Sequence, residues 1–127
     1  MLFRSIEKYL SSNSLAIQPS SSGLYYLELT AGKGKSVKTG NKVKVHYNGY
    51  FLDGSLFDSS YERNNPITFV VGNNEVIPGL DEGVLQMMEG GKSKLIIPSK
   101  IGYGAEQRGN IKPFTTLIFD VELLMVE

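Results

Sequence analysis

The hydrophobic periodicity of this chain changes from helical to strand-like after about residue 22, and this change restricts the folds open to it. Beyond that point apolar residues largely alternate with polar ones, as in antiparallel strands with one buried face. The predicted strands are 25–30, 43–48, 67–71, 92–97 and 117–125. Between the second and third of these, the turn residues Asp53-Gly54 predict a hairpin before Leu56-Phe57.

A single internal helix is predicted between the strands. It begins near Pro78, which suits a first helical turn, and Gly90-Gly91 ends it. Its apolar face comprises Leu80, Val84, Leu85 and Met88. Several strands, one short helix and no strand–helix–strand alternation indicate an α+β fold, in which an antiparallel sheet packs on that helix.

The first 22 residues are predicted to form a separate segment. Residues 1–13 have the spacing of a short amphipathic helix, and 11–22 (SSNSLAIQPSSS) have the composition of a linker. We therefore place a helix and serine-rich linker in 1–22 and the folded domain in 23–127. The helix either lies on the domain surface, docked or frayed, or serves as a dimerisation or tethering element; we favour the former.

Composition excludes several classes of chemistry. The 127 residues include no cysteine, so disulfides, thiolate metal sites and thiol nucleophiles are absent, and a single histidine, His46, argues against a catalytic triad or a multi-histidine metal site. No metal and no cofactor are expected. Thirteen basic residues balance thirteen acidic ones, which argues against a nucleic-acid partner.

The sequence also bears on membranes and compartment. No apolar run approaches the roughly 20 residues that span a bilayer. The opening residues 1–5 lack the apolar stretch of a signal peptide, so the chain as written predicts a cytoplasmic protein. The alternative is the periplasm or cell envelope, if a leader lies upstream of Met1.

Three motifs are not explained by fold alone. The first is VHYNGY at 45–50 with DGSLFDSS at 53–60, and the second is VIPGLDEGV at 76–84. The third joins GYG at 102–104 to Ile111, Pro113 and TLIFDVELL at 116–124. Together they closely resemble the FKBP-type peptidyl-prolyl cis-trans isomerases, a family that binds macrolide immunosuppressants. The resemblance covers residues 23 to 126.

The resemblance implies a half-barrel of five to six antiparallel strands wrapped around the one helix, with an apolar pocket between them. Leu80 would form the pocket floor, and Asp58 would lie at the rim, paired with Arg63. The pocket lining implied by the resemblance comprises Tyr47, Phe57, Phe69, Val76, Ile77, Tyr103, Ile111 and Phe119.

The implied activity is rotation about X-Pro peptide bonds in flexible or folding polypeptides, with no covalent intermediate. By resemblance, the Ile77 backbone N–H and the Tyr103 hydroxyl would bond substrate carbonyls, and Asp58 would act electrostatically. The implied partners are proline-containing polypeptides and macrolide ligands. Leu80 stands where many members have tryptophan, and Ile67 replaces an aromatic residue. These departures motivate the alternative, a non-catalytic peptide-binding or chaperone module that uses the same groove.

Overall fold

A computed structural model describes residues 2–127, with side chains from residue 6 onward. Its helices are α1 (Leu2–Ser12) and α2 (Pro78–Val84), with a 3-10 turn at Ser99–Ile101. Its strands are β1 (Tyr25–Thr30), β2 (Lys42–Tyr50), β3 (Leu56–Ser59), β4 (Ile67–Val70), β5 (Lys92–Ile97) and β6 (Leu117–Val126). No helix among the described residues is both long and apolar enough to cross a bilayer.

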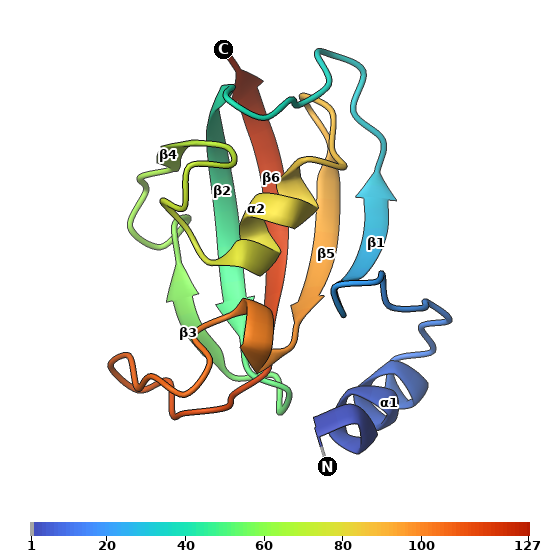
Figure 1. The fold of residues 1–127 in the computed structure, drawn as a ribbon. Helices are drawn as coiled ribbons and strands as arrows, with labels where there is room; N and C mark the ends of the chain where they lie inside the picture. Colours follow the sequence, from blue (N-terminus) through green and yellow to red (C-terminus); the bar gives the residue numbers. More distant parts are fainter. Residues whose placement is uncertain (1) are drawn as a thin grey trace.

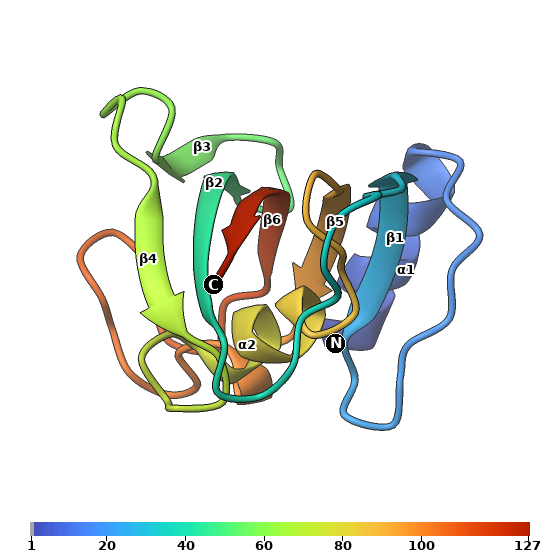
Figure 2. The same cartoon turned by 90° about the horizontal axis from the view of Figure 1, so that it is seen from above.

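The six strands form one antiparallel sheet in the order β1-β5-β6-β2-β3, with β4 paired to β2 (Figure 1). Figure 2 shows the sheet curving around α2, while α1 lies against the outer side of the sheet near β1 and β5. This arrangement confirms the predicted α+β fold, with its half-barrel sheet, single internal helix and N-terminal helix.

Two apolar clusters stabilise the two faces of the sheet. The main core lies between the inner face and α2, and includes Val45, Leu80, Leu95 and Phe119. The smaller cluster lies under α1 on the outer face, and comprises Ile6, Leu10, Tyr25, Ile96 and Ile118. The strand alternation accounts for both, because successive side chains of β5 and β6 point to opposite faces.

The N-terminal segment contacts the domain along its length. Ile6 on α1 is fully buried in the cluster on the outer face of the sheet, and further along the Ser22 hydroxyl donates to Glu82 on α2 at 2.6 Å. The helix is therefore docked on the sheet, as favoured from the sequence. The division at residue 22 stays a prediction, because the segments on its two sides are in contact.

The predicted C-terminal end of the internal helix was wrong. α2 ends at Val84, and the next turns tighten, with Gln86 N–H donating to the Gly83 carbonyl and Met87 N–H to that of Val84. This change of winding rotates the chain, so that Met87 is buried and Met88 is exposed. The helical spacing had assigned Met88 to the apolar face.

Strict alternation along 117–125 predicts that Met125 points to the same side as Leu117, Phe119, Val121 and Leu123, and this prediction was also wrong. Val45 pairs with Leu123, whereas Lys44 pairs with Met125, so one extra residue of β6 lies opposite β2. This bulge reverses the alternation beyond it, leaving Met125 exposed and Val126 in the core.

Candidate functional site

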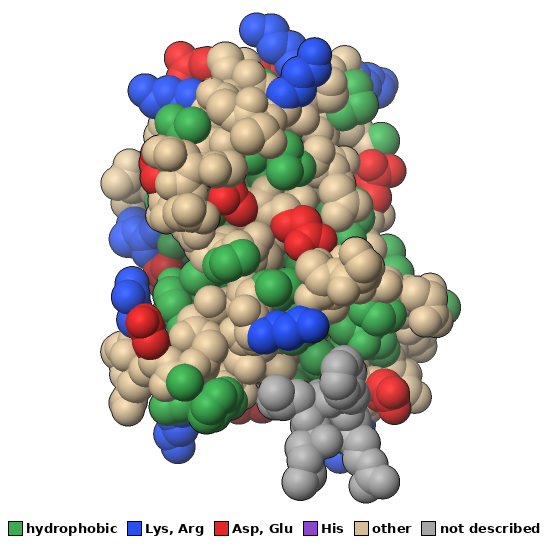
Figure 3. Space-filling model, viewed as in Figure 1, with side chains coloured by type: hydrophobic (Ala, Val, Ile, Leu, Met, Phe, Trp, Pro, Cys, Tyr) green, Lys and Arg blue, Asp and Glu red, His purple; other side chains and the backbone are tan. Residues whose placement is uncertain are grey.

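The predicted site residues gather on the inner side of the half-barrel, between α2, the β2–β3 hairpin and the loop 98–116. One hollow of about 400 Å³ is lined by Leu56, Phe57, Asp58, Ser59, Glu62 and Arg63. A second, of about 270 Å³, is lined by Asn74, Glu75, Val76, Ile77, Tyr103 and Arg108. On the face of the molecule that carries α2, scattered charged groups lie among apolar side chains (Figure 3).

Three aromatic rings form the apolar base of the site. The Phe119 ring lies between those of Tyr47 and Phe57, with centroids 5.5 and 5.7 Å away. Gly49 on β2 leaves room for them, because a Cβ there would lie 2.6 Å from Phe57 and 2.8 Å from Phe119. A larger residue at position 49 would therefore displace the rings.

The structure divides the predicted residues by accessibility. Five are buried in the main core, behind the surface of the groove: Tyr47, Phe69, Leu80, Ile111 and Phe119. The other five are half-buried and reach the surface: Phe57, Asp58, Val76, Ile77 and Tyr103. Only the second set is open to a ligand without rearrangement.

The Asp58 carboxylate is held by three groups from β2, β3 and the turn after β3. The Tyr47 hydroxyl donates to its Oδ2, Arg63 pairs with its Oδ1, and the Ser59 N–H donates to Oδ1 at 2.9 Å. Arg63 also donates to the Tyr47 hydroxyl oxygen at 3.0 Å, closing a three-membered network. The Asp58–Arg63 pairing implied by the resemblance is therefore present.

This network shifts the pKa values of its members. Partial burial works to raise the pKa of Asp58, but the hydrogen bonds from Tyr47 and Arg63 outweigh it and hold that pKa below its ordinary value. Burial, reinforced by the nearby Asp58 carboxylate, raises the pKa of the Tyr47 hydroxyl. At neutral pH the site therefore holds an ionised Asp58 beside a neutral phenol.

Two residues that line the second hollow carry a hydrogen-bond donor without an acceptor among the described residues. Ile77 is the N-cap of α2, and its carbonyl accepts from Leu80 and Asp81, but its own N–H has no acceptor within residues 2–127. The hydroxyl of Tyr103 likewise has no hydrogen-bond partner in the part of the chain that the structure describes. Both donors are available to a bound molecule.

Sequence reasoning missed Arg108 as a member of the site. Its guanidinium carbon lies 5.0 Å from the centroid of the Tyr103 ring, and its side chain lines the hollow that Ile77 also lines. No periodicity or motif points to an arginine in this irregular loop, so only its placement over the ring identifies it.

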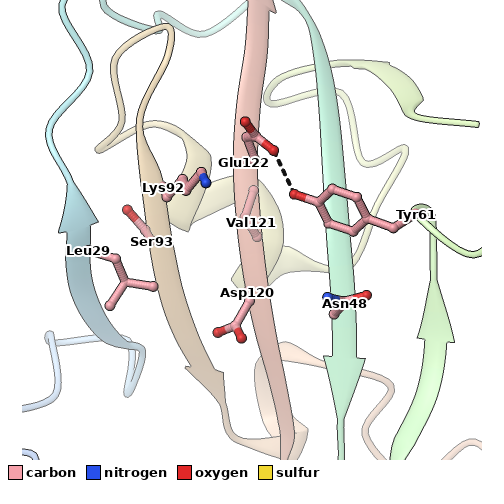
Figure 4. A pocket seen from close by; sticks show the side chains of 8 residues that line it. All are labelled: Leu29, Asn48, Tyr61, Lys92, Ser93, Asp120, Val121 and Glu122. Carbon is pink, nitrogen blue, oxygen red and sulfur yellow. Dashed lines mark hydrogen bonds between the residues drawn. The ribbon is translucent and has the colours of Figure 1, made fainter. Parts of the chain in front are cut away.

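A further hollow, of about 330 Å³, lies on the outer face of the sheet (Figure 4). Its lining comprises Leu29, Asn48, Tyr61, Lys92, Ser93, Asp120, Val121 and Glu122. The Tyr61 hydroxyl donates to Glu122 across it at 2.6 Å. None of the predicted site residues lines this hollow, so we place the functional site on the inner face.

Comparisons with known proteins point to one family. Residues 33–124 match the family model described as FKBP-type peptidyl-prolyl cis-trans isomerase. The chain is 50% identical over 105 residues to an FK506-binding protein of Neisseria meningitidis serogroup B, an alignment covering 82% of this chain and 96% of that protein. It is 44% identical over 123 residues to FkpA of Aeromonas hydrophila, covering 95% of this chain but 45% of that protein.

Solved structures give the same result. The crystal structure of Escherichia coli FkpA superposes with a TM-score of 0.87 at 40% identity, covering 98% of this chain and 58% of that one. The crystal structure of AtFKBP13 superposes with a TM-score of 0.82 at 35% identity, covering 88% of this chain and 99% of that one. The similarity therefore extends over sequence and fold alike.

Proposed function

Since the chain belongs to the FKBP-type peptidyl-prolyl cis-trans isomerase family and isomerises the peptide bond before proline, we propose that this rotation takes place in the groove between Ile77, Tyr103 and the aromatic base. Rotation is slow because it breaks amide resonance, at a barrier of about 18–20 kcal/mol. The twisted amide has lost much of its charge separation, so apolar surroundings disfavour it less than they disfavour the planar form. Such catalysis needs no nucleophile and no proton transfer.

The observation that carries this assignment is the pair of unpartnered donors in one hollow. Ile77 and Tyr103 both line the cavity of about 270 Å³, and neither the Ile77 N–H nor the Tyr103 hydroxyl has a hydrogen-bond partner among the described residues. We expect them to donate to substrate carbonyl oxygens on either side of the rotating bond. Donors fixed in this way favour the twisted geometry over the planar one, which lowers the barrier.

We assign Asp58 an electrostatic part. Its carboxylate is ionised and already accepts from Tyr47, Arg63 and the Ser59 N–H. A group whose pKa is held low is a poor proton donor near neutral pH. Asp58 therefore contributes a fixed negative charge at the rim, and orients Tyr47 and Arg63.

The test is a protease-free assay of a proline-containing peptide, with exchange between cis and trans forms followed by NMR. We expect Tyr103→Phe to lower kcat/KM, because it removes one of the two donors. The matched control is Tyr50→Phe, which removes a hydroxyl from a side chain that packs in the outer-face cluster. Equal activity of wild type and Tyr103→Phe would show that the groove has been misassigned.

Family membership also separates the two functions considered from the sequence. The catalytic function is confirmed, and its substrates are polypeptides that contain proline. The alternative, a module that only grips apolar segments, rested on Leu80 and Ile67. Leu80 is buried in the core and Ile67 is half-buried against it.

We propose macrolides as a second class of ligand for the same groove. The relatives from Neisseria carry the name FK506-binding protein, and an apolar, partly open groove suits a large apolar ring. Leu80→Trp tests this, since an indole at the floor adds apolar contact area. We expect tighter macrolide binding by calorimetric titration and a modest change in melting temperature. Unchanged or weaker binding with a lower melting temperature would mean that position 80 contributes to the core alone and not to ligand binding.

The cytoplasmic location stays a prediction, with the periplasm or cell envelope as its alternative. Fractionation of cells that express the gene from its own start, followed by immunodetection of this domain, decides between them. Recovery in the envelope fraction would contradict the cytoplasmic prediction.

A further inference from the structure

Arg108 contacts two residues of the groove at once. Its guanidinium lies over the Tyr103 ring, at 5.0 Å from the centroid. Its backbone pairs with Ile111, the Arg108 N–H donating to the Ile111 carbonyl at 2.9 Å and the Ile111 N–H to the Arg108 carbonyl at 2.8 Å. The turn 108–111 therefore fixes the backbone from which the Arg108 side chain reaches the Tyr103 ring.

Hydrogen bonds hold the backbone around Tyr103, since the Tyr103 carbonyl accepts from the Glu106 N–H at 3.1 Å and the Gly104 N–H donates to the Ser99 carbonyl at 2.8 Å. These bonds do not reach the hydroxyl end of the side chain. Tyr103 also packs against the main core. It stands between Gly102 and Gly104, and Gly104 has a φ of +59°, in the left-handed region that favours glycine. No hydrogen bond from another described side chain holds its hydroxyl. Among the described residues, Arg108 makes a cation–π contact with the Tyr103 ring.

The guanidinium has little else to bind. Its nearest anionic partner is Glu106, at 3.9 Å from Nη1, and both side chains are more than half exposed (60% and 73%). Ion pairs of this kind contribute little, since solvent screens them. The contact with the Tyr103 ring is therefore the main interaction recorded for the guanidinium, while the Arg108 side chain also lines the hollow beside Ile77.

We propose that Arg108 is a positioning residue for isomerisation: by stacking on the Tyr103 ring it aims the Tyr103 hydroxyl at the substrate carbonyl. This proposal rests on the assignment of Tyr103 to the substrate site. Arg108 acts through Tyr103 and makes no contribution of its own to the rotating bond. Its effect therefore appears in the step that uses the hydroxyl, and disappears when the hydroxyl is absent.

The first test is Arg108→Ala in the cis-trans exchange assay. We expect kcat to fall by about two- to fivefold, the factor to which one cation–π contact at an exposed site corresponds. KM should change little, because the hydroxyl acts most strongly in the twisted state. The melting temperature should stay close to that of the wild type, since the side chain is largely exposed.

Lys112→Ala is the matched control. It removes one exposed positive charge from the same loop, at a residue for which no ring contact is recorded in residues 6–127. We expect wild-type kcat and KM. An equal loss in Lys112→Ala and Arg108→Ala would assign the effect to the charge of the loop and overturn the stacking proposal. Arg108→Lys keeps a cation that can still lie over the ring, so it should lose less activity than Arg108→Ala. A loss in Arg108→Lys as large as that in Arg108→Ala would contradict the role of the cation–π contact.

A double-mutant cycle with Tyr103→Phe provides the decisive test. Phenylalanine keeps the ring but lacks the hydroxyl, so adding Arg108→Ala to Tyr103→Phe should cause no further loss. If the two losses multiply instead, Arg108 acts independently of the hydroxyl and the proposal is wrong. The proposed substrate site is tested separately, by comparing the turnover of the wild type with that of the single variant Tyr103→Phe. Loss in Tyr103→Phe with none in Arg108→Ala therefore rejects only the role of Arg108.

Discussion

At the scale of single residues, Asp58 is the charged group of the groove that other side chains hold most closely. It binds Tyr47, Arg63 and the Ser59 N–H, groups from two strands and the turn after them. Because these partners favour the ionised form, the carboxylate stabilises the folded state as well as the site. Its contribution depends on pH.

We expect the folded state to lose this contribution in acid. Folding lowers the pKa of Asp58 from its ordinary value of 3.8, so the contribution is complete above that value and disappears as the pH falls through the lower, folded value. In Asp58→Asn this part of the pH dependence is missing. The check is urea unfolding at neutral pH and at about pH 2. The loss of unfolding free energy between these two pH values should be smaller in the variant than in the wild type.

The control for this measurement is Glu62→Gln, at an exposed residue four positions along the chain. It should keep the pH dependence of the wild type. If Asp58→Asn and the wild type lose equal stability on acidification, the carboxylate is not held as the geometry indicates.

Leu80 provides a second prediction at this scale. Only 4% of it is exposed, in the main core under the groove. We expect Leu80→Ala to lower the unfolding free energy by about 2–5 kcal/mol, the range for buried leucine truncations. The matched control is Leu85→Ala just after α2, where the side chain is 37% exposed and the loss should be far smaller. Similar losses in both would place Leu80 outside the core.

At the scale of elements, two glycines let α2 lie close to β5. A Cβ at Gly79 would lie 2.6 Å from the Ile97 side chain, and one at Gly83 would lie 2.5 Å from that of Leu95. The close approach places the N-terminus of the helix, and with it the Ile77 N–H, beside the loop that carries Tyr103. Helix packing therefore sets the geometry of the donors.

We expect Gly83→Ala to destabilise the protein although alanine is the better helix former. Alanine gains roughly 1 kcal/mol of helix propensity, but overpacking against a fully buried leucine costs about 1–3 kcal/mol. Thermal and urea unfolding measure the net loss. In a Leu95→Ala background the clash is absent, so Gly83→Ala should there be neutral or stabilising. A net gain in the wild-type background would show that α2 can move away from the sheet.

The docking of α1 leads to a prediction about the N-terminal segment. Ile6 is fully buried against the outer-face cluster, which contains Tyr25 and Ile96. Ile6→Ala should lower the unfolding free energy by about 2–5 kcal/mol, provided that α1 unfolds together with the sheet. Glu7→Ala, at an exposed position of the same helix, should have little effect. No difference between the two variants would mean that α1 adds nothing to the stability of the domain.

At the scale of the whole molecule, the groove depends on pairing between distant segments. β2 pairs with β6 from Val43↔Val126 to Tyr50↔Ile118, which brings Tyr47 beside Phe119. β6 also pairs with β5 along its other edge. β6 is therefore central to the sheet, although it comes after the other five strands in the sequence.

We expect removal of residues 117–127 to abolish folding. The truncated chain would leave the facing edges of β2 and β5 without a partner at the centre of the sheet and expose the main core. Circular dichroism and the dispersion of NMR chemical shifts should show an unfolded chain. Addition of a peptide of residues 117–127 tests whether the truncated chain can recover its fold. A cooperative thermal transition in the truncated chain alone would contradict this.

Much of the fold and part of the site were predictable from local pattern. The strands and the N-terminal helix follow from apolar spacing, because each reflects which side of one element is buried. The Tyr47, Asp58, Ile77 and Tyr103 motifs indicated the family. Burial of Phe69 and Ile111 behind the groove, rather than at its surface, could not be read from the motifs, because it depends on how the loops cover them.

The sequence by itself therefore determined the α+β fold, the family and the residue types of the groove, since these depend on periodicity and on motifs within short segments. Tertiary structure alone decided the early end of α2, the bulge that turns Met125 outward and the stacking of Arg108 on Tyr103. Each of these depends on contacts or winding that residue spacing does not encode. A bulge forms where two distant strands pair, and a cation lies over a ring only after the intervening loop has folded.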